Sequence, residues 1–190
     1  MFVSGHAVMK GMMQSKLKMR VEPGLFEWLG WYKERPEWMT HQELISAGYS
    51  IDTSYTPVMR EKELRDKKVE ERRNPTAHYD RMELTCRLIS QKHADGGTVL
   101  IIGHGTTMDA AFRSFLDIPI PGKTITRKFL DKIGDHFPYC SIIGIEPAED
   151  LWKIIPNLLP NITQYDYSNR VDFHYLAKHG LQLLSSAIAD

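Results

Sequence analysis

One histidine stands between two glycines where an apolar run meets a helical pattern. Val99 to Ile102 is apolar throughout, which favours a strand covered on both faces. Gly103-His104-Gly105 follows, and a helix is predicted from Thr106 to about Phe115, where Thr106 and Asp109 have the spacing of a capping box. We therefore expect His104 at the carboxyl end of a buried strand, directly before a helix N-terminus.

This position suits an anionic ligand. Open α/β sheets bind ligands at the carboxyl ends of their strands, and the free N–H groups and dipole of a helix N-terminus suit a phosphate. His104, Gly105 and Thr106 are therefore candidate phosphate-binding residues. The same pattern is also typical of plain α/β scaffolding. It does not fit a Walker loop, because no Lys follows the glycines, or a nucleophile elbow, because no Ser is present.

Glu27 is the second candidate, because it is the one carboxylate within the aromatic stretch Leu25 to Leu29. A carboxyl group among apolar neighbours can serve as a general acid or base. The alternative is a glutamate exposed on a loop. Large rings follow closely and are expected to anchor this stretch on the core: Trp28, Trp31, Tyr32 and Trp38.

Composition limits the classes of function. The chain has 190 residues, 42% hydrophobic and 25% charged, with zero formal net charge, which predicts one globular domain over residues 1–190. A neutral chain gives no sign of a nucleic-acid or membrane partner. Two cysteines without a secretory signal favour reduced thiols and a cytoplasmic or nuclear location. His174 and His179 do not share a helix face, and no zinc motif occurs, so no metal is expected.

The order of elements predicts an α/β fold. Asn74-Pro75 starts a helix that runs to about His93, and a turn at 95–97 leads to the central strand. This helix is expected to bury Tyr79, Met82, Cys86 and Ile89. Twelve of the fourteen residues in 60–73 are charged, which predicts a solvated helix or connector, with phosphate binding by its arginines as an alternative. Further predicted elements are helices at 4–15, 123–133 and 171–188, a short helix after Thr40, and strands at 17–21, 140–145 and 151–155. A hairpin is one arrangement expected for the last two strands.

Two stretches of the chain, RVEPGLFEW at 20–28 and IGHGTTMD at 102–109, resemble the histidine phosphatase (phosphoglycerate-mutase-like) superfamily. The nearest branch comprises ecdysteroid-phosphate phosphatases and the phosphatase domain of ubiquitin-associated and SH3 domain-containing proteins, suppressors of T-cell-receptor signalling. The resemblance covers about Lys16 to Asn161. It implies a three-layer α/β fold, a sheet flanked by helices. By motif match it also implies that His104 is the family's second, phosphate-holding histidine and that Glu27 is its acid/base, with no cofactor or metal.

The family's nucleophilic histidine lies in an Arg-His-Gly motif on its first strand, and this sequence contains no Arg-His-Gly. The resemblance therefore implies an incomplete sheet that lacks its first strand. Strand 99–102 would then expose unpaired N–H and C=O groups, which implies marginal stability, rearranged packing or pairing with another chain, a homodimer included. We expect phosphatase-like binding of a phosphorylated small molecule or phosphoprotein with little turnover. The alternatives are a non-catalytic phosphate- or partner-binding relative and a fragment of a longer phosphatase.

Overall fold

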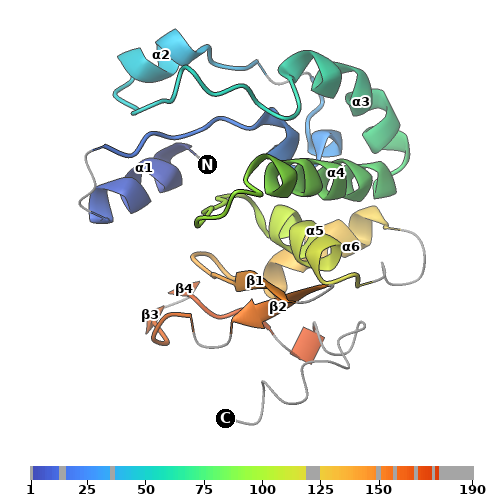
Figure 1. Cartoon of the computed structure of the whole chain (residues 1–190). Helices are drawn as coiled ribbons and strands as arrows, with labels where there is room; N and C mark the ends of the chain where they lie inside the picture. The colour runs from blue at the N-terminus through green and yellow to red at the C-terminus, as the bar shows by residue number, and fades with distance from the viewer. Residues whose placement is uncertain are drawn as a thin grey trace.

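Two helices, α4 (Thr76–Lys92) and α5 (Gly105–Phe115), pack against each other at the centre of the molecule (Figure 1). The computed structural model describes residues 2–12, 16–34, 37–118, 125–148, 151–155, 158–164, 167–172 and 174–175. On one side of α4 lie α1 (Phe2–Gly11), α2 (His41–Ser46), α3 (Glu61–Arg73) and the short turns η1 (Pro23–Leu25) and η2 (Leu29–Trp31). Beyond α5 lie α6 (Arg127–Lys132), η4 (Ile133–Asp135) and the strands.

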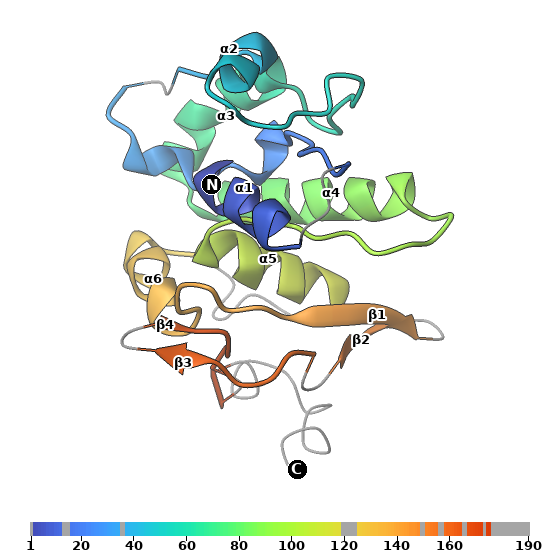
Figure 2. The same ribbon diagram turned by 90° about the vertical axis from the view of Figure 1, so that its left-hand side faces the viewer.

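The strands form two small antiparallel hairpins. β1 (Gly144–Ala148) pairs with β2 (Leu151–Ile155), with Gly144 opposite Ile155, and this hairpin lies under α5 (Figure 2). β3 (Thr163–Gln164) pairs with β4 (Tyr167–Ser168). The hairpin predicted at 140–145 and 151–155 is confirmed, although its first strand begins later. Helices with a small sheet give the predicted α/β class with an incomplete sheet.

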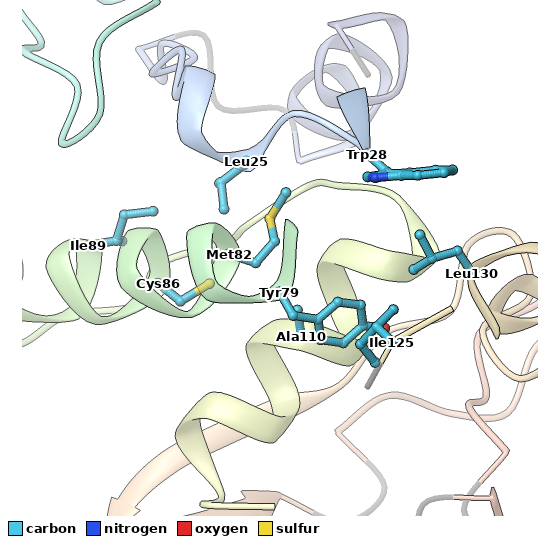
Figure 3. Packing of buried hydrophobic residues seen from close by; sticks show 9 residues of the cluster. All are labelled: Leu25, Trp28, Tyr79, Met82, Cys86, Ile89, Ala110, Ile125 and Leu130. Atoms are coloured by element: carbon cyan, nitrogen blue, oxygen red, sulfur yellow. The ribbon is translucent and has the colours of Figure 1, made fainter. Parts of the chain in front are cut away.

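The main core joins α4, α5 and the aromatic stretch that carries Glu27, as Figure 3 shows. Its buried members are Leu25, Trp28, Tyr79, Met82, Cys86, Ile89, Ala110, Ile125 and Leu130. The four α4 residues predicted to be buried are among them, because their spacing places them on one helix face. Burial raises the pKa of the Cys86 thiol to about 12, whereas Cys140 is exposed.

The buried strand predicted at Val99–Ile102 is wrong. This segment forms no strand, and Val99 and Leu100 are 45% and 51% exposed. Its backbone has no hydrogen-bonded neighbour within the described part of the chain. An apolar run becomes a buried strand only when other strands flank it, and no strand in the described ranges lies beside this one.

Smaller predictions have mixed outcomes. The capping box after Thr40 is confirmed, and the charged run 60–73 forms helix α3. The capping box at Thr106 and Asp109 is wrong, because α5 begins at Gly105 with His104 as its N-cap. Strand 17–21 is reduced to a single bridge between Met19 and Ile51. Most of the helix predicted at 171–188 lies outside the described residues.

No helix among the described residues is long and apolar enough to cross a membrane.

Candidate functional site

The structure brings Glu27 and His104 together. The Nε2 atom of His104 lies 4.0 Å from Oε2 of Glu27, and the two side chains are 38% and 26% exposed. The residues are distant in sequence, so only the packing of the aromatic stretch beside the start of α5 makes them neighbours. At this distance the carboxylate attracts the imidazole when the imidazole is protonated, and both groups reach solvent. A titratable acid and a histidine are thus available to one ligand.

Tyr32 fixes the other oxygen of the Glu27 carboxylate. The Tyr32 hydroxyl donates to Oε1 of Glu27, which leaves Oε2 facing His104. Burial raises the pKa of Tyr32, and the hydrogen bond and charge of Glu27 raise it further. The phenol therefore stays protonated at neutral pH and remains a donor to the carboxylate.

Arg81 holds the backbone that carries Glu27. Its guanidinium is 1% exposed and comes from the first half of α4. Nη1 donates to the carbonyls of Gly24 and Phe26 at 2.6 and 2.8 Å, and Nη2 donates to the Glu27 carbonyl at 3.3 Å. One rigid fork of donors thus fixes three carbonyls of this turn.

Glu71 balances the charge of Arg81 and fixes the residues that follow Glu27. Its carboxylate accepts from Nε and Nη2 of Arg81 at 2.6 and 3.1 Å, and it is fully buried. Glu71 also accepts from the Leu29 backbone N–H through its carboxylate and from the Trp28 indole through its carbonyl. The guanidinium donors of Arg81 are thereby directed to groups inside the protein, so Arg81 is a structural clamp in this arrangement.

Sequence reasoning missed this clamp. Glu71 lies within the charged run 60–73, which was predicted to be solvated. The available signal was its spacing from Leu64, since residues seven apart share a helix face and Leu64 is buried. Nothing in the sequence marks Arg81 as different from an exposed helical arginine.

His104 reaches the site as the N-cap of α5. Its carbonyl accepts from the Met108 N–H at 3.0 Å, so the first turn is helical and its leading N–H groups, at Gly105, Thr106 and Thr107, bond no protein acceptor within the described residues. A Cβ on Gly103 would lie 2.8 Å from two carbon atoms of the Thr107 side chain, so this position needs glycine. A Cβ on Gly105 would meet Phe137 at 3.5 Å, an ordinary contact.

Asp109 anchors α5 to its neighbours instead of capping it. Its Oδ2 accepts from the Tyr79 hydroxyl at 2.7 Å and from Nε of Arg113 at 2.9 Å. Burial and the Asp109 charge hold the pKa of Tyr79 well above its usual range, so this donor is permanent. The bond from Tyr79 ties α5, and with it His104, to α4, whereas the bond from Arg113 lies within α5.

The predicted site residues lie together but differ in exposure. Glu27, His104, Gly105 and Thr106 lie in one region, at the start of α5, although Thr106 is buried. The described residues contain no group of three or more His, Cys, Asp or Glu side chains that could hold a metal ion. His179, considered earlier as a ligand, lies outside the described residues.

Relatives of known sequence share much of this chain. It is 34% identical over 149 residues to an ecdysteroid-phosphate phosphatase of Drosophila melanogaster, a match that covers 76% of this chain and 18% of the relative. A protein of the same name from Bombyx mori is 33% identical, with 85% and 23% covered. Human ubiquitin-associated and SH3 domain-containing protein A is 33% identical, with 56% and 16% covered.

The chain thus spans about a fifth of the length of these curated relatives. No family model matches it. Among solved structures, the ecdysone phosphate phosphatase of Bombyx mori in complex with tungstate is similar, with a TM-score of 0.62 and 24% identity. The match covers 91% of this chain and 64% of that one, and it shows the fold.

Proposed function

This chain belongs to the histidine phosphatase superfamily, and from that premise we propose that its Glu27–His104 pair is a phosphoryl-binding half-site. The observation that carries the proposal is the 4.0 Å approach of His104 Nε2 to Glu27 Oε2 beside the N-terminus of α5. An imidazole, free backbone N–H groups and a carboxyl group at one place match the needs of a phosphomonoester.

Each group has a distinct role in the proposal. His104 and the N–H groups of Gly105 and Thr106 bind the phosphoryl oxygens and offset their negative charge. Glu27, when protonated, gives its proton to the leaving oxygen as the bond from that oxygen to phosphorus breaks. The ionised Glu27 then takes a proton from the water whose oxygen bonds to phosphorus, so that alcohol and phosphate are released and Glu27 is protonated again. Tyr32 holds Glu27 in place for this proton transfer.

We propose that this chain hydrolyses phosphomonoesters slowly or not at all. Phosphoryl transfer in the family passes through a nucleophilic histidine in Arg-His-Gly, a motif this sequence does not contain. The substrate class is a phosphomonoester of a small molecule or of a protein; the names of the relatives favour a steroid phosphate within the first group. The second candidate is a non-catalytic phosphate-binding protein, favoured by the clamping of Arg81 inside the fold.

Phosphate binding tests the proposal. We expect millimolar inorganic phosphate to raise the thermal midpoint of the wild-type chain, because a ligand that binds only the folded state stabilises it. His104→Ala should abolish the shift, and Glu27→Gln should change it less. His93→Ala is the matched control, since His93 caps the end of α4 rather than the start of α5.

An aryl phosphate assay separates the two candidates. Turnover that His104→Ala and Glu27→Gln abolish would favour hydrolysis by this chain. Phosphate binding without turnover would favour the non-catalytic candidate. A wild-type chain that shows neither a phosphate-dependent shift nor turnover would contradict the half-site itself.

A further inference from the structure

His78 is a fully buried histidine with one satisfied and one unsatisfied ring nitrogen. It lies in the first turn of α4 and is 0% exposed. Its Nδ1 lies 2.9 Å from Nη2 of Arg81. A guanidinium only donates, so Nδ1 must accept, and the proton of the neutral ring is on Nε2. Among the described residues this buried Nε2–H has no hydrogen-bond partner.

The ring of His78 is held neutral. Burial lowers its pKa well below the usual value, and the electrostatic influence of Arg81, followed by that of His104, lowers it further. Nε2 is therefore a donor throughout the physiological pH range. A buried N–H without an acceptor costs about 1–3 kcal/mol, so native proteins nearly always give such a group a protein or water partner.

His104 carries the complementary group, a buried acceptor without a donor. Its Nε2 faces the carboxylate of Glu27, which favours a proton on that nitrogen. Nδ1 of the neutral ring is then an acceptor, and this atom is also buried without a partner among the described residues. The described residues thus contain a buried donor without an acceptor, on His78, and a buried acceptor without a donor, on His104.

The clamp places the two rings around the same segment. Nη2 of Arg81 contacts both Nδ1 of His78 and the carbonyl of Glu27, at 2.9 and 3.3 Å. Glu27 in turn faces His104. The influence of the His104 charge on His78 agrees with this placement.

We propose that His78 is a positioning residue for His104, and that its Nε2–H is joined to Nδ1 of His104 through one ordered water molecule. A buried water that bridges two otherwise unsatisfied polar groups is an ordinary part of protein structure. The bridge holds the His104 ring in one orientation and one tautomer, with Nε2–H presented to the ligand. The inference deepens the proposed function, on which its phosphate readout rests.

The relay this creates runs from Glu71 through Arg81 and His78 to His104. The same Arg81 that fixes the backbone of Glu27 also fixes the acceptor nitrogen of His78. Both groups of the half-site are therefore positioned by one buried cation, although neither touches it through its own functional atoms.

Two variants of His78 test the relay. Leucine removes both ring nitrogens. Glutamine keeps an acceptor for Arg81 and a donor toward His104, so His78→Gln is the rescue variant for His78→Leu. The readouts are the histidine tautomers, measured from two-bond ¹H–¹⁵N correlations in the folded protein, and the affinity for inorganic phosphate.

We expect both His78 and His104 of the wild type to show the Nε2–H tautomer. In His78→Leu, His104 should become a mixture of tautomers, and phosphate affinity should fall roughly threefold to tenfold, the size of one hydrogen bond. His78→Gln should restore most of both. A purely structural role would lower stability in His78→Leu and leave the His104 tautomer unchanged.

Failure of this inference is distinguishable from failure of the proposed function. An unchanged His104 tautomer in His78→Leu overturns the inference, whatever phosphate does. Phosphate binding that His104→Ala abolishes but His78→Leu leaves intact also overturns it while the half-site stands. Absence of phosphate binding by the wild type overturns the half-site, and the tautomer measurement still decides the role of His78.

Discussion

The two backbone segments that bring Glu27 and His104 together are supported in opposite ways. Segment 24–29 is held by side chains: Arg81 bonds three of its carbonyls, and Glu71 bonds its Leu29 N–H. Segment 98–102, which leads to His104, has no backbone hydrogen bond within the described residues, and its apolar side chains are partly or largely exposed. On its other side the backbone of His104 continues into α5, where its carbonyl accepts from the Met108 N–H.

This difference shows which contacts hold each residue of the proposed half-site in place. The backbone around Glu27 is fixed by the buried ion pair of Arg81 with Glu71, and removal of either partner would leave the other charge buried and unpaired. The backbone of His104 depends on α5, which the hydrogen bond between Tyr79 and Asp109 joins to α4. Substitutions in the clamp and in segment 98–102 should therefore have very unequal effects.

The largest effect is expected from Arg81→Met. The substitution leaves the Glu71 carboxylate buried without its cation and leaves the three carbonyls of segment 24–29 without donors. Removal of one partner from a buried pair costs about 3–5 kcal/mol, so we expect a fall of that size in the free energy of unfolding. Urea unfolding followed by circular dichroism measures it.

Arg72→Met is the matched control, because Arg72 is exposed on the same helix as Glu71. It should change the free energy of unfolding by less than about 0.5 kcal/mol. Similar changes in the free energy of unfolding for the two variants would show that Arg81 does not clamp segment 24–29.

A smaller, pH-dependent effect is expected from His78. Its pKa in the folded chain is depressed, by burial first and then by Arg81 and His104. Below about pH 6.5 the unfolded chain binds a proton that the folded chain does not, so stability falls as pH falls. We expect up to about 1.4 kcal/mol lost per pH unit between pH 6.5 and 5.

His78→Gln removes this titration, so its stability should depend less on pH over the same interval than that of the wild type. Urea unfolding at several pH values measures both curves. Parallel curves would mean that His78 takes up a proton in the folded state, and would weaken the view that the clamp region is closed to solvent.

The smallest effect on stability is expected in segment 98–102. Leu100→Lys replaces a side chain that is half exposed, so the free energy of unfolding should change by less than about 0.5 kcal/mol. Lysine on an unpaired edge opposes strand pairing between chains, so any self-association seen by light scattering should decrease. A large loss of stability would show that this segment is covered in solution.

The helices and the pairing of β1 with β2 could be predicted because their signals are local. The spacing of Tyr79, Met82, Cys86 and Ile89 defines one face of α4 whatever lies around it. Val99–Ile102 was misjudged for the opposite reason. A buried strand needs neighbouring strands to pair with, and the presence of those neighbours cannot be inferred from an apolar run alone.

The two residues of the proposed half-site, Glu27 and His104, were predicted from sequence only as members of two separate motifs. The residues that support it, Glu71, Arg81 and His78, are polar or charged types that are seldom fully buried, and only Glu71 has a spacing, seven residues after Leu64, that hints at burial. Their burial depends on three segments meeting, namely α3, α4 and the turn at 24–29. Contacts of that kind are set by tertiary packing, which periodicity does not encode.

The two cysteines of the chain differ in exposure, so their reactivity can report on opening of the core around α4. Cys86 is fully enclosed and its thiol is protonated at neutral pH, whereas Cys140 is open to solvent. Alkylating reagents attack the thiolate, so the native protein should be modified at Cys140 alone. The rate at which Cys86 is alkylated, followed by mass spectrometry, would then report how often the core around α4 opens to solvent.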